Sequence, residues 1–243
     1  MIFLRSLTFN IFYLIWCAIF FTPCLLLMLF PQRYMLIAGH YWAIVIFWLL
    51  KVICGTTYEI RGKENLPKDG KFLLVSKHQS AWETIALMAF QDNPCIVLKK
   101  QLLRIPFFGW YLWKSGVVAI DRKAGTKALR QMISESKEAL EQNRPIVIFP
   151  EGTRSTPGQP PEYQTGIAAL YSGLNVPVCP AALNSGLFWG KDAFVKRPGT
   201  IVLEYLPLIP TGLKPRVFMK TLQDTIETAS NDLMEEAKKV EGK

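Results

Sequence analysis

The sequence has few residues that could bind a metal ion or build a disulfide framework. Its 243 residues include two histidines and five cysteines, and no two cysteines form a C-x-x-C pair. Structural metal sites and disulfide-rich folds both need clustered or regularly spaced cysteines. We therefore expect no metal site, no cofactor and no disulfide, and interpret the cysteines as small buried apolar residues in a reducing compartment.

The sequence also lacks any run of five or six basic residues, although its formal net charge is +9. Nucleic-acid-binding domains usually concentrate such charge on a polar surface. Here half of the residues are apolar, and the lysines and arginines are spread among aromatic residues. This balance argues against a nucleic-acid partner and favours attraction to anionic membrane lipids and to a phosphorylated small molecule.

A third absence is that of charged side chains between residues 11 and 30. Twenty helical residues rise about 30 Å, enough to cross a hydrocarbon core. A second apolar run at 35–50 completes a helical hairpin, but it is short and carries His40, so two full spans and a dip into one leaflet stay open. No A-x-A cleavage site follows, so we expect a retained membrane anchor over 1–53 and a globular domain over 54–243.

The globular part alternates short apolar runs with amphipathic segments. Runs that predict strands lie at 58–61, 72–76, 95–98, 117–120, 146–149, 178–183 and 200–205. Segments that predict helices lie at 81–90, 125–142, 162–173 and 215–240. Alternation of this kind predicts an α/β fold with a mixed, mostly parallel central sheet flanked by helices.

One of the two histidines, His78, follows the apolar run 72–75 and precedes Glu83 by five residues. On a continuous helix, residues five apart point about 140° away from each other, so these side chains would not meet. Ser80 and Glu83 form an S-x-x-E capping box that starts a helix at Ala81 and leaves His78 in the preceding loop. The pattern predicts either a capped helix alone or a general base, His78, oriented by Glu83.

The predicted strand at 146–149 is followed by a turn that carries a carboxylate, a glycine, a hydroxyl and a guanidinium, at Glu151, Gly152, Thr153 and Arg154. Glycine lets the backbone approach an anion, and arginine can bind phosphate oxygens bidentately. The turn lacks the G-x-x-x-x-G-K-[ST] pattern of a nucleotide-binding loop. It is either a surface turn with an internal ion pair or a binding site for the phosphate of a ligand other than a nucleotide.

Basic and large apolar residues are interleaved at 99–110. Such a segment suits a membrane surface, where the aromatic groups of Phe107, Phe108 and Trp110 sink while the cations stay with the phosphates. Plain core packing is the alternative for these aromatic residues. Arg122, just past the next predicted strand, is placed to contact the same phosphate as the turn after 149.

Four blocks of the chain, in this order, resemble those of the glycerolipid acyltransferase family: His78-x4-Glu83, Gly116 to Arg122, Pro150 to Arg154, and Val176 to Ala181. The resemblance covers residues 55 to 205. It implies an enzyme that transfers an acyl group from acyl-CoA or acyl carrier protein to the free hydroxyl of lysophosphatidic acid. The product would be phosphatidic acid, an intermediate of phospholipid biosynthesis.

The resemblance also implies roles for individual residues. His78 would be the general base and Glu83 its partner, while the substrate phosphate would be bound by Arg122, Glu151, Gly152, Thr153 and Arg154. The acyl- or membrane-facing residues would be Phe107, Phe108, Trp110 and Pro180. The anchor would hold the catalytic domain on the cytoplasmic face of the membrane, which in a bacterium is the inner membrane.

The chain departs from the family pattern at two positions. Glu83 stands where the family usually has aspartate, and Gln164 stands where it often has a lysine two residues before a glycine. The second departure leaves the identity of the acceptor substrate undetermined. Acylation of another lyso-lipid, such as a lyso-ornithine lipid, or of glycerol 3-phosphate is therefore an alternative. A membrane lipid-binding scaffold without catalysis is the alternative outside the enzymes.

Overall fold

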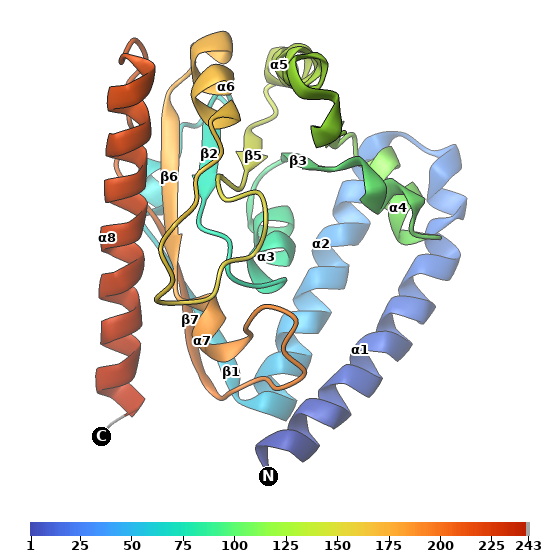
Figure 1. Ribbon diagram of the computed structural model, residues 1–243. Coiled ribbons are helices and arrows are strands. Elements are labelled where there is room, and N and C mark those ends of the chain that lie inside the picture. The colour runs from blue at the N-terminus through green and yellow to red at the C-terminus, as the bar shows by residue number, and fades with distance from the viewer. Residues whose placement is uncertain (242–243) are drawn as a thin grey trace.

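The computed structural model describes residues 1–241 as one seven-stranded sheet with helices on both faces (Figure 1). The strand order is β1-β7-β6-β2-β5-β3-β4, and the paired strands run parallel except for β6 and β7. The strands are β1 (Thr56–Arg61), β2 (Leu73–Ser76), β3 (Cys95–Lys99), β4 (Val118–Ile120), β5 (Ile146–Ile148), β6 (Val178–Leu183) and β7 (Gly199–Tyr205). The predicted mixed, mostly parallel sheet is confirmed.

The helices differ more from their predicted bounds than the strands do. They are α1 (Ile2–Cys24), α2 (Gln32–Leu49), α3 (Trp82–Phe90), α4 (Phe108–Lys114), α5 (Gly125–Glu141), α6 (Gly166–Leu174), α7 (Ser185–Phe188) and α8 (Pro215–Glu241). Helix α6 begins four residues later than predicted, because residues 161–164 form no regular structure. The short helices α4 and α7 were not predicted, since four to seven residues are too few to show a periodic pattern.

The central strands are buried on both faces, because successive side chains of a strand point to opposite sides. On β2, Leu73 and Val75 belong to the core that α5, α6 and α8 cover. Leu74, between them, belongs to the core on the other face, against α2 and α3. All three side chains are fully buried, which explains why this strand reads as an unbroken apolar run.

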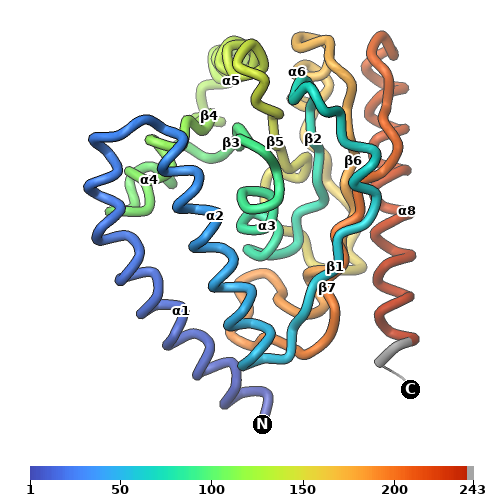
Figure 2. Tube along the Cα trace, turned by 180° about the vertical axis from the view of Figure 1, so that it is seen from behind, coloured from blue at the N-terminus to red at the C-terminus, as the bar shows by residue number. Residues whose placement is uncertain are grey.

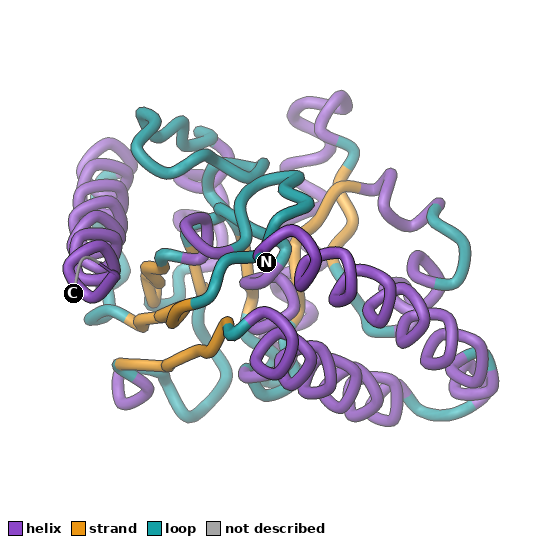
Figure 3. The backbone as a smooth tube through the Cα atoms, turned by 90° about the horizontal axis from the view of Figure 1, so that it is seen from below, coloured by secondary structure: helices purple, strands orange, loops and turns teal. Residues whose placement is uncertain are grey.

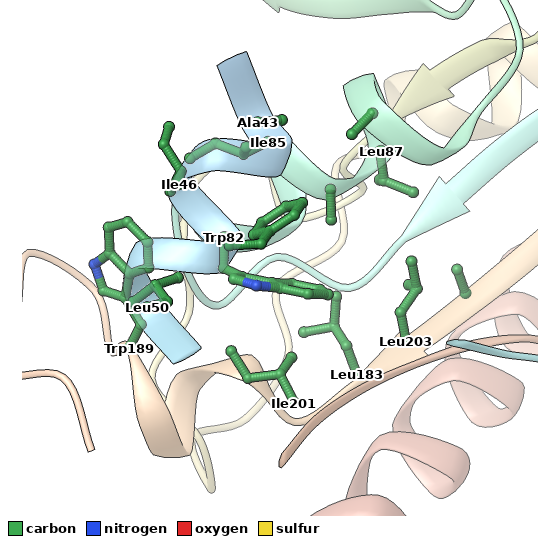
Figure 4. Close-up of a cluster of buried hydrophobic side chains, with 14 of the residues drawn as sticks. Ala43, Ile46, Leu50, Trp82, Ile85, Leu87, Leu183, Trp189, Ile201 and Leu203 are labelled. Carbon is green, nitrogen blue, oxygen red and sulfur yellow. The ribbon is translucent and has the colours of Figure 1, made fainter. Parts of the chain in front are cut away.

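Trp82, at the start of α3, lies at the centre of the second core (Figure 4). Its neighbours in that cluster include Ile46 of α2 and Leu50 of the turn that continues α2 toward β1. Ile201 of β7 and Trp189, which follows α7, close the cluster from the sheet side. The N-terminal helices therefore share one core with the sheet.

Helices α1 and α2 form the predicted hairpin and lie at the side of the molecule opposite α8 (Figure 2). With the turns that continue them, they span Ile2–Leu29 and Gln32–Cys54 and are long and apolar enough to cross a membrane, with mean hydropathies of 2.3 and 1.9 over their most apolar 18 residues. Only 6% of that stretch is buried in the first helix, so α1 presents most of its apolar surface outward. The view from below shows the two helices side by side (Figure 3). These features fit membrane association.

The beginning of α1 is bonded to the loop between α7 and β7. Ser6 Oγ accepts the backbone N–H of Lys196 at 2.9 Å, and Asn10 Oδ1 accepts its Nζ at 2.8 Å. The Lys196 ammonium also lies over the rings of Phe9 and Trp189, 5.5 and 5.0 Å from their centroids. Because Lys196 is itself buried, this contact fixes the hairpin to the domain.

The ends of the parallel strands bring distant loops to one edge of the sheet. Strands β2 and β5 pair in register, with Val75 opposite Ile148. The loops that leave these two strands therefore start side by side, and they carry His78 and the turn that begins at Pro150. In open α/β sheets, ligands bind in crevices at this carboxyl edge.

Candidate active site

His78 and Glu83 meet across the turn that starts α3. The His78 Nδ1 atom lies 2.9 Å from Glu83 Oε1. The same oxygen accepts the backbone N–H groups of Gln79 at 2.6 Å and Ser80 at 2.5 Å, while Ser80 Oγ accepts the N–H of Trp82 at 3.0 Å. The bond from the Ser80 N–H to Glu83 is the one expected of a capping box, whereas the Ser80 hydroxyl bonds Trp82 instead of Glu83, and α3 begins at Trp82, one residue later than predicted. Together these bonds hold the carboxylate against the imidazole.

Glu83 is fully buried, and both of its carboxylate oxygens are hydrogen-bonded. The hydroxyl of Ser185, at the start of α7, donates to Oε2 at 2.8 Å. A buried carboxylate needs such donors to offset the loss of its water. With one oxygen bound to Ser185 and the other shared by three donors, Glu83 has a single orientation, and it fixes the imidazole ring.

The rest of His78 is fixed as firmly as its ring nitrogen. The ring stacks on Phe149 with centroids 4.1 Å apart and planes inclined by 21°. The backbone N–H donates to Glu151 Oε2 at 2.9 Å, and the carbonyl oxygen accepts the N–H and hydroxyl of Ser155 at 2.7 and 3.1 Å. Since Nδ1 faces Glu83, the other ring nitrogen, Nε2, is available for a substrate in the adjoining cavity.

The turn after β5 carries Arg154 and contacts Arg122, which follows β4. Gly152 has a φ of +68°, and a Cβ at this position would overlap the guanidinium of Arg122. Arg122 Nη1 donates to the Gly152 carbonyl at 2.7 Å, so only a glycine allows this approach. Arg154 Nη2 lies 2.6 Å from Asp192 Oδ1 in a solvent-exposed ion pair. Both arginines line the cavity that contains His78.

Glu151 does not lie where it could bind a substrate phosphate. It is 5% exposed and does not line the cavity that contains His78. One oxygen accepts the His78 N–H, and the other lies 2.6 Å from Lys77 Nζ. An unpaired carboxylate would repel a phosphate, whereas this paired one organises the backbone beside the histidine.

The cavity next to His78 has a volume of about 610 Å³. Its polar end is formed by His78, Arg122, Gly152, Thr153 and Arg154, with Gln164 nearby on the cavity wall. The remaining walls are largely apolar and come from β3, α4, β4 and α5, including Ile96, Leu98, Phe108, Leu112, Ile120, Leu129 and Met132. This combination suits a ligand with a charged head and a long apolar tail.

The four residues expected to face acyl chain or membrane have different surroundings. Phe108 lines the cavity, whereas Phe107 and Trp110 are 44% and 47% exposed on the outer surface of the same segment. Pro180 is buried in β6 beside Val75 of β2 and lines no part of the cavity. It therefore packs inside the sheet and faces neither an acyl chain nor a membrane.

Several residues of the site were not identified from the sequence. Phe149 and Ser185 follow within two residues of the ends of β5 and β6, a signal that marks loop residues near a sheet edge but does not give their direction. Lys77 is adjacent to His78, yet its partner Glu227 is 150 residues away on α8. No local pattern in the sequence links those two residues.

The chain is similar in sequence to known acyltransferases. The family model described as Acyltransferase matches residues 57–184. The 1-acyl-sn-glycerol-3-phosphate acyltransferase of Pseudomonas aeruginosa is 41% identical over 172 residues, which are 71% of this chain and 66% of that protein. The corresponding alpha enzyme of Ovis aries is 31% identical over 169 residues, or 68% of this chain and 59% of that protein. The matches thus span less than two thirds of these relatives.

The fold has a solved counterpart as well. The crystal structure of the 1-acyl-sn-glycerophosphate acyltransferase PlsC from Thermotoga maritima superposes with a TM-score of 0.80. It covers 96% of this chain and 98% of its own, at 22% sequence identity, and so shows the same fold. The family match spans more than half of the 243 residues and includes His78, Glu83 and the turn after β5. This chain therefore belongs to the acyltransferase family.

Proposed function

We propose that this protein transfers an acyl group from an acyl thioester to the free hydroxyl of lysophosphatidic acid and so produces phosphatidic acid. The observation that carries the proposal is the His78–Glu83 pair, 2.9 Å apart, with His78 lining a cavity whose walls also hold two arginines and many apolar side chains. A general base in such a cavity could act on the hydroxyl of a ligand that has both a phosphate and an acyl chain.

His78 Nε2 would take the proton of the acceptor hydroxyl as its oxygen attacks the thioester carbonyl carbon. The new C–O bond forms a tetrahedral intermediate, whose collapse breaks the C–S bond. The proton then passes from the imidazolium to the departing thiolate, which leaves as a thiol. Glu83 would stabilise the imidazolium between these steps and hold the tautomer that carries its proton on Nδ1.

The cavity supports the choice of a phosphorylated, lipid-like acceptor. Arg122 and Arg154 would bind the phosphate, and the Arg154–Asp192 ion pair is exposed enough for a phosphate to replace the carboxylate. Thr153 offers a further donor at the same end. The apolar walls would hold an acyl chain, while Gln164 leaves that side of the polar end uncharged.

The membrane would supply the acceptor. We propose that residues 1–53 attach the protein to lipid and that residues 54–243 carry the chemistry on the cytoplasmic face. The exposed rings of Phe107 and Trp110 lie in a basic segment with Lys99, Lys100 and Arg104, which suits contact with anionic lipid headgroups. Acyl-CoA or acyl carrier protein would deliver the acyl group from the aqueous side.

Thiol release from oleoyl-CoA with lysophosphatidic acid in detergent micelles tests this function, with phosphatidic acid identified by mass spectrometry. We expect His78→Ala to lower kcat by about 100- to 10,000-fold, the range usual for loss of a general base. The matched control is His40→Ala, which removes the other histidine, whose ring contacts the Ala89 carbonyl outside the cavity.

Each other outcome selects an alternative. Full activity in a folded His78→Ala variant would exclude His78 as the base. Thiol release with glycerol 3-phosphate or a lyso-ornithine lipid, but not with lysophosphatidic acid, would replace the acceptor. Lipid binding without thiol release for any acceptor, with either acyl-CoA or acyl carrier protein as donor, would favour a non-catalytic scaffold.

A further inference from the structure

Lys77 is a buried cation that immediately precedes the candidate base in the sequence. It follows β2, precedes His78, and is 4% exposed. Its Nζ atom lies 2.6 Å from Glu151 Oε1 and 2.7 and 3.0 Å from the two oxygens of Glu227 on α8. Neighbouring residues on an extended chain point to opposite sides, so Lys77 reaches α8 while the His78 ring reaches α3.

Glu151 connects this cation to the histidine. Its Oε2 atom accepts the His78 backbone N–H at 2.9 Å, while Oε1 lies against Lys77. The contacts form a continuous chain from Glu227 through Lys77 and Glu151 to the His78 backbone. Because Lys77 and Glu151 are almost fully buried, their attraction is screened far less than that of a surface ion pair.

The far end of the chain is held by a second contact. The hydroxyl of Tyr163, in the segment between β5 and α6, donates to Glu227 Oε1 at 3.0 Å. Burial and the nearby charges of Glu227 and Glu151 raise the pKa of Tyr163 above its ordinary value. Tyr163 therefore keeps its proton at neutral pH and remains a donor to Glu227.

We propose that Lys77 is a positioning residue for His78 and that Glu227 of α8 is the counter-ion that keeps it in place. The inference rests on the proposed function of His78 as base. Lys77 does not line the cavity next to His78 and acts through Glu151. Without the cation, Glu151 is a buried carboxylate with no charge partner, and it moves or takes up a proton. Either change releases the His78 backbone.

The first test is the steady-state kinetics of Lys77→Met and Glu227→Gln. A shift of about 1 Å far from the reacting atoms can cost about 100-fold in rate, so we expect Lys77→Met to lower kcat by about that factor. Its KM for lysophosphatidic acid should change less than about threefold, because the arginines that line the cavity are untouched. Lys220→Met is the matched control. Lys220 lies on α8, as Glu227 does, but it pairs with the exposed Asp224 of the same helix.

A second test measures the connection between Lys77 and the His78 backbone by NMR and does not depend on enzyme activity. With two histidines in the chain, selective ¹⁵N-histidine labelling gives two backbone amide signals, and His78→Ala identifies one of them. The amide proton of His78 is bonded to a carboxylate, so its chemical shift reports that bond. We expect the His78 signal to move in Lys77→Met and Glu227→Gln, and to stay in place in Lys220→Met. The His40 signal should not move in any variant.

The two tests separate this inference from the proposed function. Replacing Lys77 changes the residue before His78 and shifts its amide signal in any case, so the moved signal that counts is that of Glu227→Gln. An unchanged His78 amide signal in folded Glu227→Gln overturns the positioning role, whatever the activity. A moved signal in Glu227→Gln, together with a wild-type protein that lacks acyltransferase activity, refutes the function and leaves the linkage standing. If Lys77→Met does not fold, Glu227→Gln, which keeps the size and the acceptor for Tyr163, decides the question. A Glu227→Gln variant with normal kcat and an unmoved signal then overturns the inference.

Discussion

Replacing Glu83 with glutamine tests the electrostatic part of the proposed catalytic pair, because the change removes a charge and almost no volume. The amide oxygen introduced by Glu83→Gln would still accept His78 Nδ1–H and the backbone N–H groups of Gln79 and Ser80. The new amide nitrogen would donate to Ser185 Oγ, which in the wild type donates to the carboxylate. All hydrogen bonds can therefore be made, and we expect Glu83→Gln to fold.

The magnitude follows from the distance between the groups. Opposite unit charges 2.9 Å apart attract by about 6 kcal/mol at an effective dielectric constant of about 20. This is the most that Glu83 can contribute to the imidazolium that forms during the reaction. Each 1.36 kcal/mol is tenfold in rate, so the loss in kcat should lie between about 1,000- and 10,000-fold. KM should change little, since Glu83 lines no part of the cavity.

The assay is steady-state thiol release, with the fold checked by circular dichroism and thermal unfolding. Ser185→Ala is the matched control, because it removes one neutral donor to Glu83 and leaves the charge. A hydrogen bond to a charged group contributes about 1.5–3 kcal/mol, so this variant should lose less than about 200-fold, well short of the loss expected for Glu83→Gln. A folded Glu83→Gln variant that keeps more than a tenth of the wild-type kcat would refute the reasoning.

Three further predictions follow from the cavity and the core. In Gly152→Ala, the new Cβ would be strained at a φ of +68° and would displace Arg122, so kcat/KM for lysophosphatidic acid should fall about tenfold or more while the acyl-CoA KM stays unchanged. Leu129→Trp narrows the apolar part of the cavity, and competition between acyl-CoA substrates should show a preference for shorter chains than the wild type has. Burial raises the pKa of the Cys179 thiol to about 12, so this fully buried cysteine should resist iodoacetamide in the folded protein at mildly alkaline pH and be alkylated after denaturation, as mass spectrometry would show.

The strands could be predicted because each is a short apolar run between turn residues, a local property of the chain. Their order could not. Strand β1 pairs with β7, so Thr57 lies opposite Thr200, 143 positions further along the chain, and no local pattern records such a pairing. The antiparallel pair β6–β7 was equally hidden, since it depends on how the segment with α7 turns back over the sheet edge.

The candidate site likewise has a part that the sequence predicts and a part that it does not. The His78–Glu83 contact could be expected because the capping box at Ser80 is a local device that fixes both side chains near one turn. The orientation of Glu151 could not, because its direction is set by Lys77 and by the helix that ends the described chain. The resemblance to the acyltransferase family implied a phosphate contact for Glu151, whereas the structure pairs this carboxylate with Lys77 inside the protein.

The attachment of α1 to the loop that holds Lys196 has a practical consequence for handling the protein. Deleting residues 1–53 to obtain a soluble fragment would remove Ser6 and Asn10, leave Lys196 without those partners, and uncover the core around Trp82. The same loop carries Asp192, the partner of Arg154, which lines the cavity. Purification should therefore keep the hairpin and shield its apolar surface with detergent or nanodiscs, because α1 and α2 share a core with the sheet.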